Sequence, residues 1–324
     1  MHHKKSRKIP ISLSPKASMK ALDKLREATD FLKRYGIEDA VREAESILTH
    51  CLEMERTAFF RDNPALRENV IERIDGFLVR RSKREPLQYI LGYVDFLGIK
   101  IKVGKGVLIP RPETELLAEE ALKTVTSNEL QVTSKDKNSS LVTRRQSLSI
   151  LDLCTGSGCL ALALAKEFPH AYVYGTDISE VAIRYAKENA EINGIKNVAF
   201  LKGSLFEPLG GLFTIHSSLF TFDLIISNPP YIRRDDIRNL QQEIKDWEPV
   251  EALDGGDDGL NFYRSIIPES RHYLKESGCL MLELGLGQAD AVRRIAENAG
   301  FTDISFKKDY AGIVRIFIVR NIVK

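Results

Sequence analysis

Apolar residues between positions 19 and 85 recur at the spacing of amphipathic helices. Residues 22–32 repeat an apolar position every three or four residues, and residues 41–52 do the same. A third helix is expected to begin at Asn63, a good N-cap residue that is followed by proline. These patterns predict a small helical domain over residues 19–85.

The pattern changes after this helical stretch. Residues 99–103 alternate apolar and polar side chains, which is typical of a half-buried strand, and we predict a β-hairpin linker over residues 86–110. A helix is expected over residues 114–126. Residues 127–147 are polar and patternless and are predicted to form an exposed loop, and a second insertion is expected near 210–220.

Strand and helix patterns alternate from residue 150 to the end of the chain. Strands are expected at 150–154, 172–176, 198–202, 222–227, 279–284, 304–307 and 315–320, and helices at 159–167, 180–193, 262–275 and 288–299. Such alternation predicts a doubly wound α/β domain over residues 111–324, with a mainly parallel, seven-stranded, Rossmann-like sheet covered on both faces. The last two strands are too close for a helical crossover and should pair antiparallel.

Composition and charge exclude several classes of protein. The chain has 324 residues, of which 43% are hydrophobic and 28% charged, as in ordinary globular proteins. The longest apolar run, residues 159–165, is far shorter than the roughly 20 residues of a membrane span, so no membrane association is expected. Five basic and no acidic residues lie in 1–18, which we predict to be a disordered basic extension. The rest of the chain is slightly acidic, so direct binding to nucleic acid is not expected.

Cysteine usage predicts neither a metal site nor disulfides. Cys51, Cys154, Cys159 and Cys279 form no CxxC pair and have no histidine cluster beside them. Scattered thiols and the lack of a recognisable signal peptide indicate a reducing, cytoplasmic location.

A glycine-containing turn joins the first strand of the α/β pattern to its helix. Residues 151–161 place Gly156 and Gly158 at this turn, where glycine permits positive φ and close approach of a ligand. Asp177 ends the next strand, 19 residues after Gly158, where a carboxylate can accept both hydroxyls of a ribose. The same spacing satisfies the dinucleotide-binding fingerprint, so S-adenosylmethionine and a nicotinamide cofactor are both open at this point.

The sequence Asn228-Pro229-Pro230-Tyr231 follows the apolar strand at 222–227. Its prolines remove two backbone N–H donors, so the turn presents mainly acceptors. The Asn228 side-chain oxygen and the Pro229 carbonyl can then bind the two hydrogens of one planar amino group, and Tyr231 can stack on that group. This arrangement predicts catalysis by positioning a nitrogen for attack on an activated methyl group. A nicotinamide oxidoreductase leaves the turn unexplained.

With these motifs, the chain resembles the amino-methyltransferases that use S-adenosylmethionine, and more narrowly the bacterial release factor glutamine methyltransferases. The resemblance runs from about residue 20 to residue 320. Besides the glycine turn, Asp177 and the Asn-Pro-Pro-Tyr turn, its carriers are residues 84–92, 96–98, 107–115 and Glu248-Pro249. Asn-Pro-Pro-Tyr alone is also similar to adenine-N6 methyltransferases. The stretch Arg111-Pro112-Glu113-Thr114-Glu115 is more specific.

The resemblance implies a class I methyltransferase fold, S-adenosyl-L-methionine as cofactor, and methylation of the glutamine amide nitrogen (N5) in the Gly-Gly-Gln motif of class I peptide chain release factors. It further implies a monomer whose helical domain helps to hold the release factor. The implied catalytic residues are Asn228, Pro229 and Tyr231, and the implied substrate-binding residues are Asn228, Pro229, Pro230 and Tyr231. The implied cofactor contacts are Cys154, Thr155, Gly156, Ser157, Gly158, Asp177, Leu205 and Asn228.

Two residues depart from the family pattern. Cys154 stands where the family often has glycine, so positive φ is less expected there. Leu205 replaces a tryptophan that some members place near the adenine, so aliphatic packing is expected instead of stacking. Arg111 and Glu113 fit either the mouth of an active site or a helix-entry device.

Alternative functions stay open at the level of sequence. They are methylation of a glutamine in a large-subunit ribosomal protein, adenine-N6 methylation of nucleic acid, and a non-enzymatic translation-factor or RNA-binding module that kept a methyltransferase fold. Intact Asp177 and Asn228 speak against the non-enzymatic module.

Overall fold

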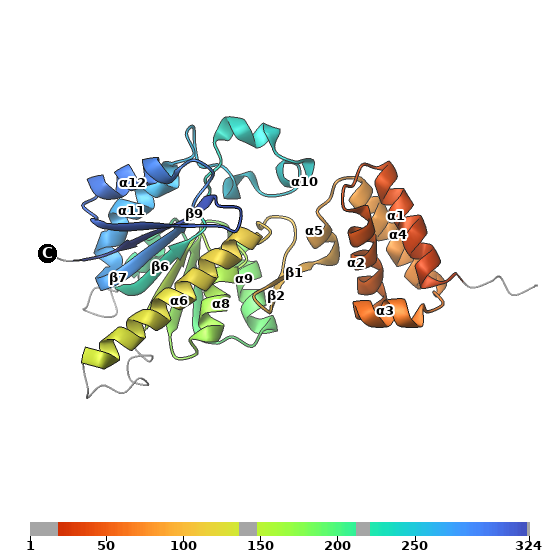
Figure 1. Cartoon of the computed structure of the whole chain (residues 1–324), viewed down its shortest axis with the longest axis horizontal. Coiled ribbons are helices and arrows are strands. Elements are labelled where there is room, and N and C mark those ends of the chain that lie inside the picture. Colours follow the sequence, from red (N-terminus) through yellow and green to blue (C-terminus); the bar gives the residue numbers. More distant parts are fainter. Residues whose placement is uncertain (1–18, 136–147, 212–220, 323–324) are drawn as a thin grey trace, which may run out of the picture. The chain divides into compact units, whose positions relative to one another are not determined.

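The computed structural model describes residues 19–135, 148–211 and 221–322, with the side chains of 127–135 and 211 excepted. The chain divides into two compact units, the first ending at Leu91 and the second beginning at Gly92 (Figure 1). The predicted helical domain, the mainly parallel sheet and the class I methyltransferase architecture are all confirmed.

The first unit is helical. Its helices are α1 Ala21–Arg34, α2 Ala40–Leu52, α3 Arg56–Asp62, α4 Glu68–Ser82 and α5 Leu87–Leu91. Their apolar stripes meet in one core, in which Leu32, Ile47, Phe59 and Ile74 are fully buried. The short helices α3 and α5 were not predicted, because segments of seven and five residues are too short to show a helical period.

The prediction that Asn63 begins a helix is wrong. Asn63 follows the end of α3 with φ 37°, and the next helix starts only at Glu68. Its side-chain oxygen instead accepts a hydrogen bond from Leu22 N, at 2.9 Å, in the first turn of α1. A backbone bond from Ala21 N to Pro64 O, at 2.9 Å, brings these segments together. The asparagine thus caps a helix 41 residues away, which a local capping pattern cannot reveal.

The second unit opens with an antiparallel hairpin of β1 Tyr93–Phe96 and β2 Ile99–Lys102, within the predicted linker 86–110. The first part of that range is instead the helix α5, which lies in the first unit. A seven-stranded sheet follows, in the order β5-β4-β3-β6-β7-β9-β8. Its strands are β3 Ser149–Leu153, β4 Tyr172–Asp177, β5 Val198–Lys202, β6 Phe222–Ser227, β7 Leu274–Glu283, β8 Asp303–Lys308 and β9 Val314–Arg320. β3 to β7 are parallel, and β8 and β9 pair antiparallel, as predicted. β9 is also antiparallel to β7, which was not predicted.

Helices cover both faces of this sheet (Figure 1). They are α6 Pro112–Lys135, α8 Cys159–Glu167, α9 Glu180–Ile192, α11 Asn261–Tyr273 and α12 Ala289–Asn298. α11 and α12 pack together over a core that includes Leu151, Leu153, Leu280 and Leu282, alternate residues of β3 and β7. Short segments, η1 Glu207–Gly211, η2 Arg234–Asn239, α10 Gln242–Lys245 and η3 Val250–Ala252, complete the unit. They were not predicted, because they are too short to show a period.

The helix α6 is longer than predicted. It continues to Lys135, so the loop prediction for residues 127–147 is wrong for its first nine positions. No glycine or proline interrupts 127–135, and a helix that has already formed gains one backbone hydrogen bond for each residue added. Residues 136–147, and the insertion at 212–220, lie outside the described residues.

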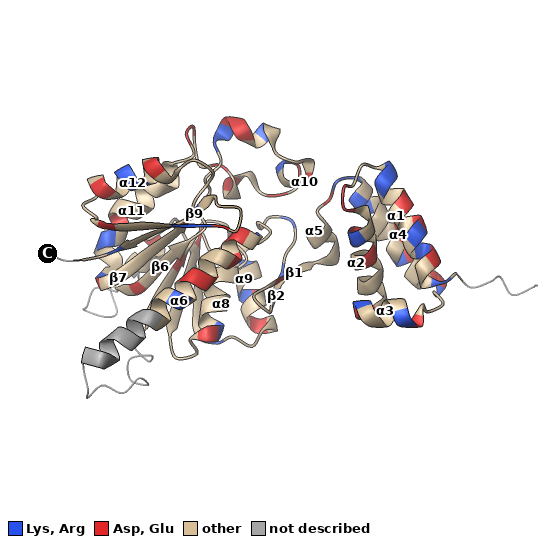
Figure 2. Cartoon of the chain, in the orientation of Figure 1, with Lys and Arg blue, Asp and Glu red and all other residues tan. Residues whose placement is uncertain are grey.

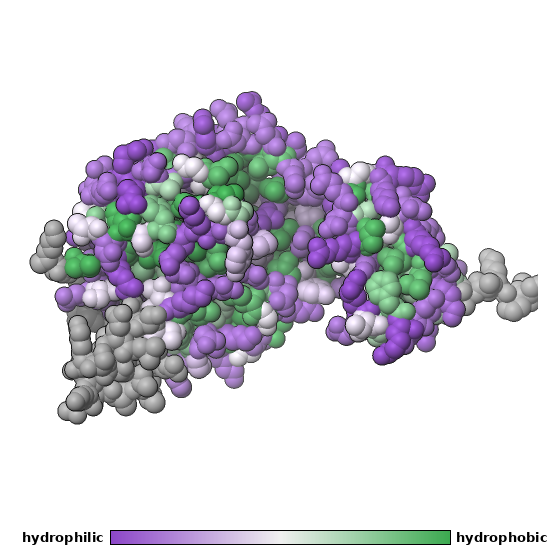
Figure 3. Space-filling view, viewed as in Figure 1, coloured by the Kyte–Doolittle hydropathy of each residue, from purple (hydrophilic) through white to green (hydrophobic). Residues whose placement is uncertain are grey.

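Charged and apolar residues are both spread over the view of the molecule in Figures 2 and 3. Basic and acidic residues are interspersed along the helices of both units (Figure 2). Hydrophilic residues cover most of the visible face, with apolar patches between them (Figure 3). Within the described ranges, no helix is long and apolar enough to cross a membrane, and no group of three or more His, Cys, Asp or Glu side chains is arranged to hold a metal ion. All four cysteines are free thiols.

Candidate active site

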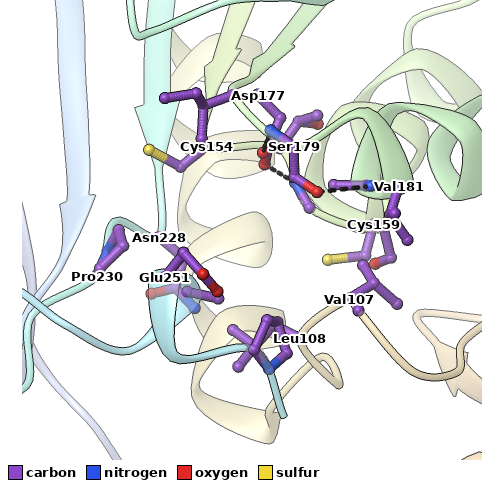
Figure 4. Close-up of a pocket in the computed structure, with 18 of the residues that line it drawn as sticks. Val107, Leu108, Cys154, Cys159, Asp177, Ser179, Val181, Asn228, Pro230 and Glu251 are labelled. Carbon is purple, nitrogen blue, oxygen red and sulfur yellow. Dashed lines mark hydrogen bonds between the residues drawn. The ribbon is translucent and has the colours of Figure 1, made fainter.

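A cavity of about 560 Å³ lies at the carboxyl ends of the parallel strands, within the second unit (Figure 4). The turns after β3, β4, β5 and β6 form part of its wall. The first turns of α8 and α9 also line it, with residues 106–108 and Pro110, residues of the 249–252 segment, Thr114 of α6 and Phe262 of α11. Ligands of open α/β sheets bind at this edge, so the topology alone makes this cavity the candidate site.

The glycine turn and Asp177 hold each other in place. Gly156 N donates to Asp177 Oδ2 at 2.9 Å, and Ser179 N donates to Asp177 Oδ1 at 2.8 Å. A Cβ on Gly158, which has φ 82°, would lie 3.0 Å from Ala186 Cβ, so glycine is needed for this close packing. Burial raises the pKa of the Asp177 carboxyl, while its two backbone donors oppose that rise. Each carboxylate oxygen keeps a free lone pair that can accept a ligand hydroxyl.

Cys154 does adopt a positive φ, of 55°, so the expectation that cysteine disfavours this conformation is wrong here. The turn around it is fixed from two sides, because Thr155 N donates to Thr176 O at 2.9 Å and Thr155 Oγ1 donates to the buried carboxylate of Asp152 at 2.5 Å. Strain of order 1–3 kcal/mol at one residue persists where the surroundings determine the backbone in this way.

A buried polar chain runs behind Asn228. Asn228 Nδ2 donates to Thr114 Oγ1 at 2.9 Å, and Thr114 Oγ1 donates to Glu283 Oε2 at 2.8 Å. Tyr231 OH donates to the other oxygen of the same carboxylate, Glu283 Oε1, at 3.1 Å. Burial and the nearby Glu283 raise the pKa of Tyr231, which keeps its phenol protonated as a donor.

Most of the predicted site residues meet at the cavity. Those that line it are Cys154, Thr155, Gly156, Ser157, Asp177, Leu205, Asn228 and Pro230. Gly158 and Pro229 do not line it, and Tyr231 directs its hydroxyl to Glu283 instead. Figure 4 shows Asn228 and Pro230 on a different side of the cavity from Asp177 and Ser179. The roles of all these residues stay predictions.

Several cavity residues were not predicted. They include Val107, Leu108, Ile178, Glu251 and Phe262. Ile178 could have been found, because it directly follows Asp177, the residue predicted to bind a ribose. The structure leaves this large apolar side chain 67% exposed at the cavity, where it can pack on a ligand. Glu251 and Phe262 belong to no sequence motif, and only the folded structure shows that they line the cavity.

Arg111 and Glu248 join two segments of the cavity wall. The buried Glu248 carboxylate accepts a hydrogen bond from Ile109 N at 3.1 Å and also pairs with the Arg111 guanidinium. Burial raises the pKa of Glu248, and the Arg111 charge opposes that rise. Arg111 does not line the cavity itself, so its observed contact joins the segment before α6 to the segment that carries Pro249.

The charge of the cavity wall favours a cationic ligand. Asp177 and Glu251 line it, and no lysine or arginine does so among the residues that the structure describes. A dinucleotide would bring a doubly negative pyrophosphate close to these two acids, with only backbone N–H groups to compensate it. A sulfonium ligand that carries a ribose fits the wall better, so the site argues against the nicotinamide reading.

Comparison with known proteins agrees with this geometry. A family model described as "PrmC N-terminal domain" matches residues 23–92, and a model described as "Methyltransferase domain" matches residues 144–284. The release factor glutamine methyltransferase of Thermodesulfovibrio yellowstonii is 46% identical over 94% of this chain and 99% of its own length. The enzyme of the same name from Geobacter sulfurreducens is 41% identical over 90% of this chain and 95% of its own length.

Among solved structures, the chain is similar to the protein-(glutamine-N5) methyltransferase (release factor-specific) from Alicyclobacillus acidocaldarius. The two are 27% identical, with a TM-score of 0.37, over 68% of this chain and 99% of that one. The near-complete coverage of the two relatives at more than 40% identity decides the assignment. The chain belongs to the family of release factor glutamine methyltransferases.

Proposed function

We infer that this protein transfers a methyl group from S-adenosyl-L-methionine to the side-chain amide nitrogen (N5) of the glutamine in the Gly-Gly-Gln motif of class I peptide chain release factors. Family membership supports the reaction and its substrate. The structural observation that carries it is the Asn228 carboxamide, held at the cavity by its Nδ2 so that its oxygen is left to accept from a ligand.

The residues of the cavity fit the proposed cofactor. The turn from Cys154 to Gly158 would lie against it, and Asp177 would accept the hydroxyls of its ribose. Leu205 and Ile178 offer apolar surface to the adenine. S-adenosylmethionine supplies a methyl group that is already activated by a positively charged sulfur, and so it requires no metal ion and no strong base before attack.

The Asn-Pro-Pro-Tyr turn would orient the acceptor. An amide nitrogen is a poor nucleophile because its lone pair is delocalised into the amide plane. Asn228 Oδ1 and the Pro229 carbonyl would each accept one of its two hydrogens, which aims the nitrogen and favours the positive charge that develops on it. Pro229 and Pro230 bring no N–H donor to compete, and the Tyr231 ring would pack on the flat amide.

We further propose that the first unit helps to hold the release factor, that the chain acts as a monomer, and that nucleic acid takes no direct part. None of the described residues of the first unit, 19–91, line the cavity, so a contribution from them would be to the protein substrate and not to the cofactor. Charge reversal of the exposed Arg26 and Arg42 should then raise the KM for release factor and leave kcat unchanged.

The proposed function is tested by methyl transfer from labelled S-adenosylmethionine to purified release factor. A factor whose Gly-Gly-Gln glutamine is replaced by alanine is the matched control, and ribosomal protein and DNA serve as competing acceptors. Label on the unaltered factor alone supports the proposal. Label on the ribosomal protein or on DNA instead would keep the chemistry and overturn the substrate.

A further inference from the structure

Thr114 and Glu283 are deeply buried beside the proposed site and take no part in the mechanism above. Their exposed fractions are 2% and 1%, and they come from α6 and from the last residue of β7, 169 positions apart. Buried carboxylates and hydroxyls are costly unless they are hydrogen-bonded, and these two bond to each other and to Asn228 and Tyr231. The chain of four side chains therefore requires an explanation.

Counting hydrogens shows what this chain enforces. A threonine hydroxyl has one hydrogen and two lone pairs, and an ionised carboxylate only accepts. When Glu283 is ionised, the hydrogen of Thr114 must point to Glu283, and only lone pairs remain toward Asn228. Asn228 can then meet Thr114 only with its NH2 group, as the 2.9 Å bond from Nδ2 shows.

The orientation of Asn228 matters because an asparagine side chain has nearly the same shape after its oxygen and nitrogen exchange places. In one orientation Asn228 presents an acceptor to the cavity. In the other orientation Asn228 presents its NH2 group to the substrate amide nitrogen. That nitrogen also carries two hydrogens, so the two groups repel. Nothing in the shape of the site separates these orientations, whereas the hydrogen at Thr114 does.

We propose that Thr114 and Glu283 are positioning residues, which fix the Asn228 carboxamide with its oxygen toward the substrate amide. The proposal rests on the proposed function, because it requires Asn228 to act as an acceptor. The proposal also assigns a role in the reaction to Thr114, the threonine of the Arg-Pro-Glu-Thr-Glu stretch. Neither residue touches the substrate in this account, and both act through Asn228.

The charge on Glu283 makes the device sensitive to pH. Burial raises the pKa of Glu283 to about 7, and the donors Thr114 and Tyr231 oppose that rise. Glu113 of α6 also raises the pKa of Glu283, and Arg315 of β9 lowers it. The charge of Glu283 in turn raises the pKa of Tyr263 of α11 and of Cys159 of α8. A protonated Glu283 can donate to Thr114, whose hydrogen then turns to Asn228 and favours the wrong orientation. The rate should therefore fall as the pH decreases through about 7.

The test compares kcat, the KM for release factor and the Kd for S-adenosylmethionine in four variants of the full chain. Thr114→Val keeps the shape and removes the hydroxyl, and its kcat should fall by about 10- to 100-fold, with KM and Kd within about twofold of the wild type. Thr114→Ser restores the hydroxyl and should recover most of the rate. Glu283→Gln should lower kcat and abolish the pH step near 7. Thr29→Val is the control. It removes the hydroxyl of a buried threonine of the first unit that does not line the cavity, and it should leave all three parameters unchanged.

The outcomes separate this proposal from the function on which it rests. Asn228→Ala is assayed beside the four variants. If Asn228→Ala is inactive while Thr114→Val keeps the wild-type rate and pH profile, the positioning proposal is overturned and the proposed function stands. If Thr114→Ser is as slow as Thr114→Val, the hydroxyl is not the cause and the proposal also fails. Full activity of Asn228→Ala would overturn both.

Discussion

Gly156 donates its backbone N–H to the carboxylate of Asp177 at 2.9 Å, so the two sequence features that indicate a nucleoside site are in direct contact. The bond spans 21 residues and joins the turn after β3 to the end of β4. Together with the bond from Ser179 N, it fixes both oxygens of Asp177 at the cavity wall. The carboxylate is therefore held in place by the chain itself, and a ligand that binds to it does not have to order it.

The first prediction is that Asp177→Ala weakens the binding of S-adenosylmethionine by about 10- to 100-fold, since two charge-assisted hydrogen bonds are lost. Titration calorimetry on the purified protein measures this change directly. Asp290→Asn, which alters an exposed acid in the first turn of α12, is the control and should bind normally. Unchanged binding in Asp177→Ala would remove Asp177 from the cofactor site.

Asn228→Ala should separate chemistry from cofactor binding. The variant loses the acceptor that positions the substrate amide, so methylation of release factor should drop by at least about 100-fold. Binding of S-adenosylmethionine should weaken by less than about fivefold, because the ribose acid and the glycine turn are intact. Equal losses in both measurements would indicate that Asn228 serves the cofactor alone.

Cofactor selectivity follows from the charge of the wall. With Asp177 and Glu251 lining the cavity, S-adenosylmethionine at about 100 times its Kd should stabilise the fold by about 2.7 kcal/mol. Nicotinamide dinucleotides should produce no shift in the thermal unfolding midpoint at the same concentration. A higher unfolding midpoint with the dinucleotide, and no change with S-adenosylmethionine, would instead support binding of a nicotinamide cofactor.

The sheet could be predicted because its strands carry their own signal. β5 and β6 were predicted to the residue, since each is a short apolar run with a clear punctuation on both sides. β7 begins five residues earlier than predicted, at Leu274. Its regular pairing with β6 nevertheless starts at the predicted Cys279, because the register shifts after Leu274 and Ser277 has φ 63°. The end of α6 was not predicted because its residues are polar. A helix that has already formed can extend through such residues without an apolar face.

The site was predictable only where its chemistry is local in sequence. Asn228 and Asp177 stand in short motifs, and the structure brings both to one cavity. Thr114 meets Glu283 across 169 positions, and Ile109 meets Glu248 across 139. Such pairs depend on the strand order and on the register of the sheet, which no local pattern contains. Glu283 is a buried acid at the end of a strand and belongs to no motif, so the sequence alone does not mark it.

The brace between Glu248 and the 109–111 segment predicts a combined loss of stability and affinity. Glu248→Ala leaves the Arg111 guanidinium and the Ile109 N–H without their acceptor, which should lower the free energy of unfolding by about 1–3 kcal/mol. Because both joined segments line the cavity, the Kd for S-adenosylmethionine should also rise. Urea denaturation and calorimetry measure the two effects, with Glu297→Ala on the exposed face of α12 as the control. A loss of affinity without any loss of stability would mean that Glu248 contacts the ligand directly.

The hydrogen bonds of Asn189 predict a loss of stability, whose size depends on pH, when its amide is replaced by a carboxyl group. This fully buried side chain accepts from Lys102 N at 2.7 Å through Oδ1, and donates through Nδ2 to Lys102 O and to Ser157 O, each at 3.0 Å. It thereby ties the hairpin strand β2, the glycine turn and α9 together.

Asn189→Asp has the same shape but directs a carboxylate oxygen at two carbonyl oxygens, so the free energy of unfolding should fall by about 2–4 kcal/mol at pH 8. Burial and the two carbonyls should raise the pKa of the introduced carboxyl. Its protonated form can donate to one of them, so the deficit should shrink as the pH is lowered toward 5. Chemical denaturation at the two pH values measures this, beside Asn239→Asp at an exposed position. An equal deficit at both pH values would show that packing, and not the pattern of donors and acceptors at Asn189, sets the cost.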